Sequence, residues 1–379
     1  AIKTLIYLTL ISLAVDCIYD TIRAKVGKII KINKLRYMKE INKNWTLAKV
    51  WNESIEKRSD RPVEARQRIY ASELGRADVD IFLKLKGEIP SNPPNARAFR
   101  KFAAGDAFEW FVRLVLVRAG IYMASQTPVK TTLPNCLEVS GKLDFIAGGQ
   151  PRYSEAQEEI DKLIALLELP DVFHQISTNI IEYFKANYPN GLDEKVLEVK
   201  SVATYGYERI EKTNKALGGH DLQLFHYANG LQKEGAICYI CRDDLRMYEI
   251  PILPNDQKLL GRYKEKIARV SKFYFDDVQP EIEPIINFDE EMGRFSKNFN
   301  VEYSAFLQKL YGFERPDLYD EKFSPLIERW NRVLGRMKEG AKMTDNNLEA
   351  LKEIAEHGFS IVEIQKKLKT TVAKPINDK

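Results

Sequence analysis

Lys195 to Val202, with the sequence KVLEVKSV, is rich in valine and leucine and mixes them with polar residues. This composition and alternation are typical of a β-strand. Because side chains two apart point to the same face of a strand, Glu198 and Lys200 are expected to share one face while Val199 points into the core. The stretch therefore predicts a strand that presents a carboxylate beside an ammonium group.

Further strands and helices are expected around this one. The strand patterns are Val129–Leu133, Glu138–Ile146 and a hairpin of Ala236–Arg242 and Arg246–Ile250. The helical patterns are Phe99–Ala119, which is apolar around most of its circumference and is expected to be buried, Tyr153–Tyr188, which Pro170 interrupts, and Asp221–Gln232. Together they predict an α/β fold with a small mixed central sheet flanked by helices.

The length of the chain suggests two or three folding units. We expect helical segments before, within and after the α/β core. The predicted parts are an apolar and basic N-terminal segment of uncertain status (1–37), a helical N-terminal section (38–98), the core (99–254) with a helical insertion (153–188), a helical section (255–340) and a C-terminal helical hairpin (341–379).

The first of these parts contains an apolar run, Thr4 to Val15. A membrane-spanning helix needs ~20 apolar residues, so this run resembles a signal-peptide core or a buried element more than an anchor. A basic stretch from Arg23 to Lys39 follows it, and such a stretch is either a solvated helix face or a contact for phosphates or a membrane surface. We expect no membrane partner and place residues 1–37 outside the functional core.

Charge and cysteine content limit the function only weakly. Lys and Arg number 58 and Asp and Glu 54, so the net charge of +4 neither requires nor excludes a nucleic-acid partner. The four cysteines are too few for a disulfide scaffold in a chain of this length and fit a reducing, cytoplasmic compartment. They are Cys17, Cys136, Cys238 and Cys241.

A candidate metal site follows from two of the predicted strands. Asp144 lies near the end of Glu138–Ile146, and if this strand pairs with Lys195–Val202, its carboxylate can meet that of Glu198. Two carboxylates, with the backbone carbonyl of Val199, form the oxygen-rich ligand set that Mg²⁺ or Mn²⁺ prefers. A metal ion held there would activate water for hydrolysis of a phosphodiester, and Lys200 would orient that water or stabilise the developing charge.

Three motifs in this order resemble the RecB-like nucleases of the PD-(D/E)XK superfamily. They are GxxD at Gly141–Asp144, ExK at Glu198–Lys200 and QxxxY at Gln223–Tyr227. The resemblance covers about residues 72–250 and implies a restriction-endonuclease-like core. It also implies that Gln223 and Tyr227 help to position the scissile strand, and that Glu109, four residues after Gly105, is a further metal ligand.

The same resemblance implies an activity. Asp144, Glu198, Lys200, Gln223 and Tyr227 would form the catalytic site of a metal-dependent deoxyribonuclease, with Glu109, Asp144, Glu198 and Val199 as metal ligands. Its substrate would be single- or double-stranded DNA with free ends. An exonuclease or end-processing enzyme of recombination, repair or phage and mobile-element DNA metabolism fits this branch best.

Some relatives, such as the CRISPR-associated adaptation nucleases, bind an iron–sulfur cluster through one cysteine before the first helix motif and three after the tyrosine motif. This chain lacks a cysteine in Ser72–Ala77 and after Cys241, so no cluster is expected. The gap between Asp144 and Glu198 is also longer than usual in the family. Residues 153–188 must therefore loop out, with Gly148-Gly149 and Pro189-Asn190-Gly191 as hinges.

Two alternatives stay open. The chain could be a catalytically weak DNA-end-binding scaffold that keeps the nuclease fold, although the intact ExK motif argues against this. Asn347–His357 and Ile361–Lys369 resemble the first two helices of a helix-turn-helix, but Pro375 follows before a recognition helix can form. A plain helical hairpin is an equally good interpretation of this C-terminal part.

Overall fold

A computed structural model describes residue 46 and residues 49–50, 63–152, 172–289 and 293–368 of the chain. The chain divides into two compact units, Ala1–Arg58 and Ser59–Lys379. Every helix and strand named below belongs to the second unit. The apolar run, the basic stretch and Cys17 lie outside the described residues.

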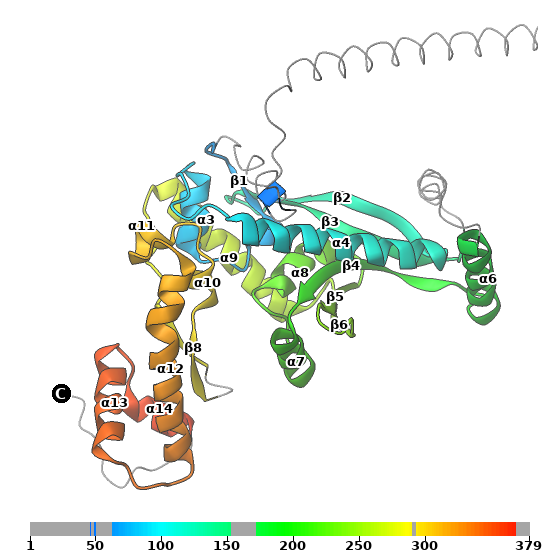
Figure 1. Cartoon of the computed structure of the whole chain (residues 1–379). Coiled ribbons are helices and arrows are strands. Elements are labelled where there is room, and N and C mark those ends of the chain that lie inside the picture. The colour runs from blue at the N-terminus through cyan, green and yellow to red at the C-terminus, as the bar shows by residue number, and fades with distance from the viewer. Residues whose placement is uncertain (1–45, 47–48, 51–62, 153–171, 290–292, 369–379) are drawn as a thin grey trace, which may run out of the picture. The chain divides into compact units, whose positions relative to one another are not determined.

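The centre of the second unit is a six-stranded mixed sheet (Figure 1). The strand order is β1-β3-β4-β5-β6, with β2 paired to β3. The pairs β1–β3 and β4–β5 are parallel and the other pairs are antiparallel. The strands are β1 (Arg68–Tyr70), β2 (Tyr122–Thr131), β3 (Glu138–Gly149), β4 (Leu192–Val202), β5 (Gly235–Cys241) and β6 (Met247–Ile252). The expected mixed sheet flanked by helices is confirmed.

Strand β3 changes partner along one of its edges. On one edge it pairs with β2 from Val139 to Ala147. On the other it pairs with β1 at Glu138–Ser140 and with β4 only from Phe145 onward. Within the described ranges, Gly141–Asp144 therefore has no strand partner on that second edge, and we call these four residues the strand gap. The GxxD motif occupies the strand gap and no other part of β3.

Helices cover both faces of the sheet (Figure 1). On one face, α4 (Ala96–Arg118) packs Val112, Leu116 and Val117 against apolar residues of β3, β4 and β5. On the other face, α8 (His220–Leu231) and α9 (Gln257–Asp276) share a core with β1 to β6. The short helix α7 (Thr204–Thr213) follows β4. The sheet is thus buried on both sides around β5, as the apolar sequence of this strand requires.

The connection between β3 and β4 leaves the sheet at glycines that no other residue can replace without strain. Gly148 has φ +130°, and a Cβ there would lie 2.5 Å from the Asp193 carbonyl oxygen. Gly191 has φ +81°, and its Cβ would lie 2.8 Å from the Gly149 carbonyl oxygen. These close backbone contacts fix the base of the insertion. Within the insertion, α6 (Val172–Asn187) is described and residues 153–171 are not.

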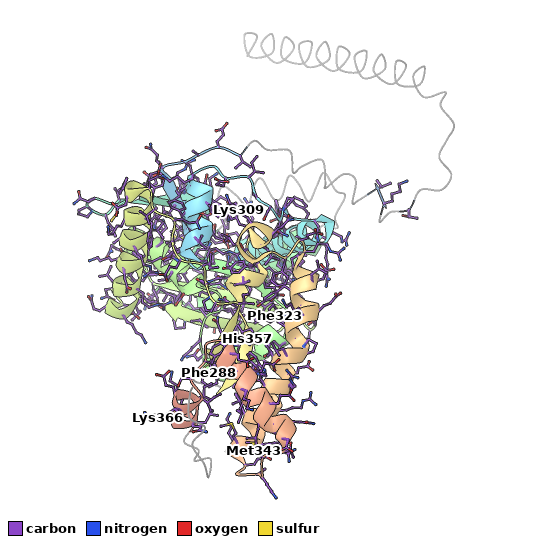
Figure 2. The ribbon with its side chains drawn as sticks, turned by 90° about the vertical axis from the view of Figure 1, so that its left-hand side faces the viewer. Phe288, Lys309, Phe323, Met343, His357 and Lys366 are labelled. Carbon is purple, nitrogen blue, oxygen red and sulfur yellow. The ribbon has the colours of Figure 1, made fainter. Side chains whose placement is uncertain are left out.

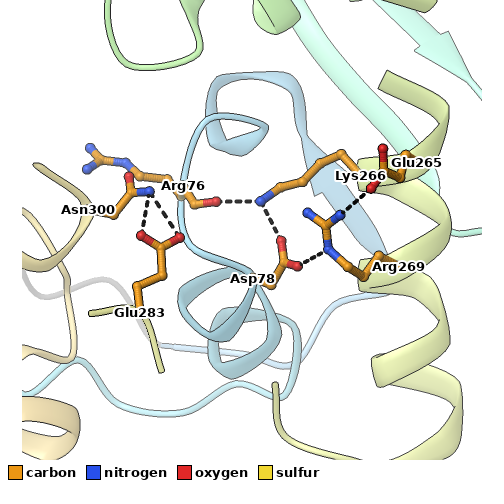
Figure 3. A network of polar contacts seen from close by, with 7 residues as sticks. All are labelled: Arg76, Asp78, Glu265, Lys266, Arg269, Glu283 and Asn300. Atoms are coloured by element: carbon orange, nitrogen blue, oxygen red, sulfur yellow. Dashed lines mark hydrogen bonds and ion pairs between the residues drawn. The ribbon is translucent and has the colours of Figure 1, made fainter. Parts of the chain in front are cut away.

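Between β1 and α4 the chain forms a 3-10 turn, η1 (Ala71–Glu73), and helix α3 (Asp78–Leu85). Asp78, in the first turn of α3, forms ion pairs with Lys266 and Arg269 of α9 (Figure 3). Burial alone would raise the pKa of Asp78, but the hydrogen bond from Arg269 and the charge of Lys266 lower it below its usual value. The pairs therefore hold α3 against α9 with Asp78 ionised.

A second apolar core lies in the C-terminal part. It is formed by the hairpin β7 (Ile286–Asp289) and β8 (Arg294–Lys297) and by helices α12 (Pro316–Lys338), α13 (Asp345–Glu356) and α14 (Ile361–Lys367). Figure 2 shows Phe288, Phe323, Met343 and His357 in this part. The Trp330 ring of α12 lies at its centre and contacts the Phe295 ring at 5.0 Å. Two short helices, α10 (Phe299–Glu302) and α11 (Leu307–Tyr311), precede α12.

Three expectations need correction. The section 38–98 was expected to be helical, but it supplies the strand β1 (Arg68–Tyr70) to the sheet. The section 255–340 also contains a hairpin, β7 and β8. Helix α4 was expected to be buried, yet Phe102, Trp110, Phe111 and Val115 are each about half exposed. Phe102 lies before the part of α4 that packs on the sheet. Val115 lies between Val112 and Leu116, which do pack on it, so the other exposed apolar residues lie on a side of the helix that the sheet does not cover.

In the C-terminal part, α13 and α14 form the predicted helical pair, separated by a turn at His357–Ser360. Ser360 caps α14 by accepting a hydrogen bond from the Glu363 amide. Residues 369–379, where a recognition helix would follow, lie outside the described residues. No helix within the described ranges is long and apolar enough to cross a membrane.

Candidate active site

The strand gap brings the first candidate carboxylate to β4. Asp144 is the last residue of the gap, and Phe145 beside it pairs with Leu197 as the first pair of the β3–β4 ladder. One residue beyond Leu197 lies Glu198, so Asp144 and Glu198 flank the point where the two strands separate. The backbone N–H of Val199 donates a hydrogen bond of 2.8 Å to Asp144 Oδ2. The side chain of Asp144 thus spans the two strands where their ladder ends.

Glu198 lies at the centre of the site and is 2% exposed. Its Oε1 accepts hydrogen bonds from Lys200 Nζ at 2.6 Å and from Gln223 Nε2 at 2.5 Å. Its Oε2 is buried and has no hydrogen-bond partner among the residues that the structure describes. A buried carboxylate oxygen without a partner is costly in a folded protein, because it has lost water without gaining a donor. This oxygen is available for a cation.

The electrostatics of the site are those of carboxylates held together away from water. Burial raises the pKa of Glu198 to about 7, although Lys200 opposes the shift. Burial also raises the pKa of Asp144, against the charge of Lys200 and the hydrogen bond from Val199. For Lys200 burial acts to lower the pKa, but Glu198 and Asp144 raise it overall, so its ammonium group stays charged. The site is short of positive charge.

Glu109 approaches the same site from α4. It is half-buried, and burial followed by the charges of Asp144 and Asp106 raises its pKa to about 7. Its charge in turn contributes to the raised pKa of Glu198. Glu109 is therefore close enough to the two strand carboxylates to act on them electrostatically. No described hydrogen bond links it to either of them.

The Tyr227 side chain occupies the space that a side chain at position 141 would need. A Cβ at Gly141 would lie 2.5 Å from the Tyr227 hydroxyl oxygen and 2.9 Å from Ala71 Cβ. Tyr227 is buried on α8, one turn after Gln223, and burial raises the pKa of its hydroxyl. The glycine of GxxD thus leaves room for the tyrosine of QxxxY. Two motifs far apart in the sequence are one packing unit.

We expect Gly141→Ala to destabilise the protein by about 1–3 kcal/mol, because the new methyl group must displace Tyr227 or Ala71 from a packed position. The matched control is Gly105→Ala in α4, where a Cβ would have no neighbour within 4 Å. That change should stabilise the helix by about 0.5–1 kcal/mol. Denaturant unfolding of both variants measures the difference. Equal stability of Gly141→Ala and the parent chain would contradict the proposed contact.

The structure thus brings Asp144, Glu198, Lys200, Gln223 and Tyr227 together, with Glu109 beside them. In the described parts of the chain, no three Asp, Glu, His or Cys side chains are grouped closely enough to enclose a metal ion. The donor set still fits Mg²⁺, which is commonly bound through one or two carboxylates and completes its shell with water and substrate phosphate. The open oxygen of Glu198 is the observation that fits a cation here.

His226 and the CxxC pair have structural roles. His226 is buried, with Nδ1 2.8 Å from the Tyr263 hydroxyl and Nε2 3.3 Å from the Val129 carbonyl oxygen. Burial lowers its pKa to about 4, so it stays neutral. Cys238 and Cys241 are buried free thiols of β5. None of these groups reaches the carboxylates through a described hydrogen bond.

One part of the site was missed in the sequence. A pocket of about 410 Å³ adjoins Gln223 and Tyr227, and Arg68, Lys130 and Lys142 line it as well. Arg68 and Lys130 come from strands that flank β3 on opposite edges. The sequence contains a local signal for these cations. Arg68 is adjacent to the buried Ile69 in β1, and Lys130 is adjacent to the buried Val129 in β2. Without the strand pairing, these were only exposed cations on separate strands.

Comparison with known proteins adds little to this geometry. No family model matches the chain, and no curated protein matches it. Among solved structures, one titled "Crystal structure of SSO0001" is 13% identical, covers 59% of this chain and 87% of that chain, and has a TM-score of 0.34. So slight a likeness carries no argument about function.

Proposed function

We propose that this chain is a metal-dependent deoxyribonuclease that hydrolyses phosphodiester bonds at the site of Asp144, Glu198 and Lys200. The observation that carries the proposal is the convergence of two buried carboxylates and a charged lysine at the point where β3 and β4 separate. Such clusters of carboxylates with raised pKa are typical of catalytic and metal-binding sites. A surface strand with alternating charges would not have a fully buried Glu198.

Asp144 and Glu198 would hold a divalent ion, Mg²⁺ or Mn²⁺, with Glu109 and the Val199 carbonyl as further ligands. The ion would supply a Lewis acid for the phosphate and lower the pKa of a water molecule. The Val199 N–H fixes the orientation of Asp144 through their hydrogen bond. Gln223 does the same for Glu198. These contacts keep both carboxylates in place before a substrate arrives.

Lys200 would act on the reacting phosphate rather than on the protein alone. Its side chain is about one quarter exposed, whereas its partner Glu198 is buried. It can therefore donate to an oxygen of the substrate and stabilise the negative charge that grows on the phosphate during attack. Tyr227, which lies one turn from Gln223 on α8, would help to position the scissile strand.

The proposal extends to the setting of the enzyme. Cys136, Cys238 and Cys241 are free thiols, which supports a reducing, cytoplasmic compartment. An exonuclease or end-processing role in recombination, repair or mobile-element DNA metabolism stays the preferred assignment. The runner-up is a DNA-end-binding scaffold without activity, and the complete set of Asp144, Glu198 and Lys200 favours the enzyme.

The experiment is incubation of the protein with end-labelled single- and double-stranded DNA, linear and circular, in Mg²⁺, Mn²⁺ or EDTA. We expect cleavage with either metal and none in EDTA, because in the proposed mechanism the ion polarises the phosphate and lowers the pKa of the attacking water. Cleavage of linear but not circular DNA identifies an exonuclease. Full cleavage in EDTA would refute the metal-dependent mechanism, and DNA binding without cleavage in any metal would favour the scaffold.

A further inference from the structure

The pocket beside the candidate active site is built on three neighbouring strands. Ser140 of β3 pairs with Tyr70 of β1 on one side and with Lys130 of β2 on the other. Residues at paired positions have Cβ atoms about 4.5–5.5 Å apart. These three residues therefore form one row across the sheet, and all three line the pocket.

Two more cations lie on the same face as this row. Arg68 lies two residues before Tyr70, and Lys142 lies two residues after Ser140, so each shares a face with its neighbour in the row. Both side chains are exposed, whereas Ile69 and Val139 on the opposite face are fully buried. Arg68, Lys130 and Lys142 thus reach one pocket from three strands.

The charge of this pocket is only slightly neutralised. Lys130 pairs with Glu138 at 3.5 Å, but the two side chains are 62% and 32% exposed, so the pair is weak in water. Arg68 hydrogen-bonds to the Tyr70 side chain, which lowers the pKa of that hydroxyl. Within the described residues Lys142 has no ion-pair partner. A pocket with three cations and one partly paired acid attracts an anion.

Tyr70 adds an aromatic surface to the pocket. Tyr70 is 38% exposed, and the Arg66 guanidinium lies 4.1 Å from its ring centroid. Arg66 is itself fixed by an ion pair of 2.6 Å with Glu73. The ring is therefore held in place and still partly open. An aromatic ring of this kind can stack on a nucleic-acid base, whichever base it is.

The pocket is continuous with the candidate active site. Gly141 of the strand gap lines it, and so do Gln223 and Tyr227. Gln223 also hydrogen-bonds to Glu198. A group bound in the pocket thus lies one side chain away from the proposed metal ligand. Its volume of about 410 Å³ fits a ligand of small-molecule size rather than a duplex.

We propose that this pocket binds the phosphate of a single nucleotide unit of the substrate strand, through Arg68, Lys130 and Lys142, and so sets which bond reaches Glu198. This inference rests on the proposed function, because it takes nucleic acid as the ligand. The phosphate has two possible sources, a terminal phosphate at the strand end or an internal phosphodiester. Both present negatively charged oxygens to the same three cations.

The test measures binding in EDTA, so that it does not depend on cleavage. The probes are thymidine 5′-monophosphate, thymidine, and one single-stranded oligonucleotide with a 5′-phosphate, with a 3′-phosphate or with hydroxyls at both ends. The proteins are the full chain, the pocket variant Arg68→Met/Lys142→Met and the control variant Lys195→Met/Lys212→Met. The control removes the same charge at two positions outside the pocket.

We expect the pocket variant to bind the oligonucleotides that carry the recognised phosphate at least 10-fold more weakly than the control variant. If a terminal phosphate is the ligand, the parent chain binds thymidine monophosphate but not thymidine, and prefers an oligonucleotide with a phosphate at one end. The pocket variant then loses that preference. If an internal phosphodiester is the ligand, all three oligonucleotides weaken equally in the pocket variant.

The proposal is overturned if the pocket variant, with the melting temperature of the parent chain, binds every probe as tightly as the control variant does. That outcome leaves Mg²⁺-dependent cleavage by the parent chain as a separate question. Conversely, phosphate binding in the pocket without cleavage in any metal would refute the proposed function but support the role of the pocket in binding phosphate.

Discussion

Lys200→Met should reduce single-turnover DNA cleavage by about 10²–10³-fold while metal binding survives. The substitution keeps the length of the side chain and leaves both Asp144 and Glu198 in place. It removes the cation that forms an ion pair with Glu198, so a divalent ion meets less repulsion at the site. DNA affinity should change little, because one cation contributes only a fraction of the attraction to phosphates.

Asp144→Ala and Glu198→Ala should behave differently, because each removes a proposed ligand. Both cleavage and the rise in melting temperature with Mg²⁺ should be lost together, since a metal stabilises only the state that binds it. The matched control is Lys195→Met, a lysine of the same strand whose partner is Glu234 at 3.3 Å. If Lys200→Met cleaves DNA near the parental rate at saturating metal, the ExK motif is not catalytic and is only part of a strand with charged side chains.

Glu198→Gln should abolish cleavage and yet make the metal-free protein more stable at pH 8. Burial raises the pKa of Glu198 from 4.5 in the unfolded chain to about 7 in the folded one. Its contribution to stability is therefore fully present below pH 4.5 and is lost as the pH rises through 7. Glutamine cannot ionise, and its carbonyl oxygen can still accept from Lys200 and Gln223.

We expect Glu198→Gln to gain about 1–3 kcal/mol over the parent chain at pH 8 in EDTA, and to lose this advantage by pH 5. Denaturant unfolding at both pH values measures the difference, which includes the coupling of Glu198 to the charges of Asp144 and Glu109. Saturating Mg²⁺ should then reverse the order at pH 8, because only the parent chain binds it well. If the variant is less stable than the parent at pH 8 in EDTA, ionised Glu198 does not destabilise the folded protein.

The local sequence was enough to predict the central strands and the charged face of β4. The alternation around Glu198 and Lys200 is a property of consecutive residues, and so is the helical spacing of Gln223 and Tyr227. The hydrogen bond from Val199 to Asp144 could not be predicted, because it depends on where the β3–β4 ladder ends. The strand gap depends in turn on β1, whose three residues are too few to show a period.

Helix α4 illustrates a different limit. Its apolar residues are distributed around the helix, which predicts burial, but the sequence does not say how far the sheet extends beneath it. Val112, Leu116 and Val117 lie over the sheet and are buried. Phe102, earlier in the same helix, lies beyond that contact and is 56% exposed. The spacing of apolar residues shows which faces of a helix can be buried, and the neighbouring elements determine which of them are buried.

The glycines at the base of the insertion have an evolutionary consequence. The β3–β4 ladder closes at Gly149 and Leu192, so the chain between them can lengthen without altering the register at Phe145 and Leu197. Doubling the length of a flexible loop costs only about 0.6 kcal/mol of closure entropy. Insertions at this position are therefore nearly neutral to selection for stability. A lineage can acquire a new substrate-contacting module there while Asp144 and Glu198 stay in register.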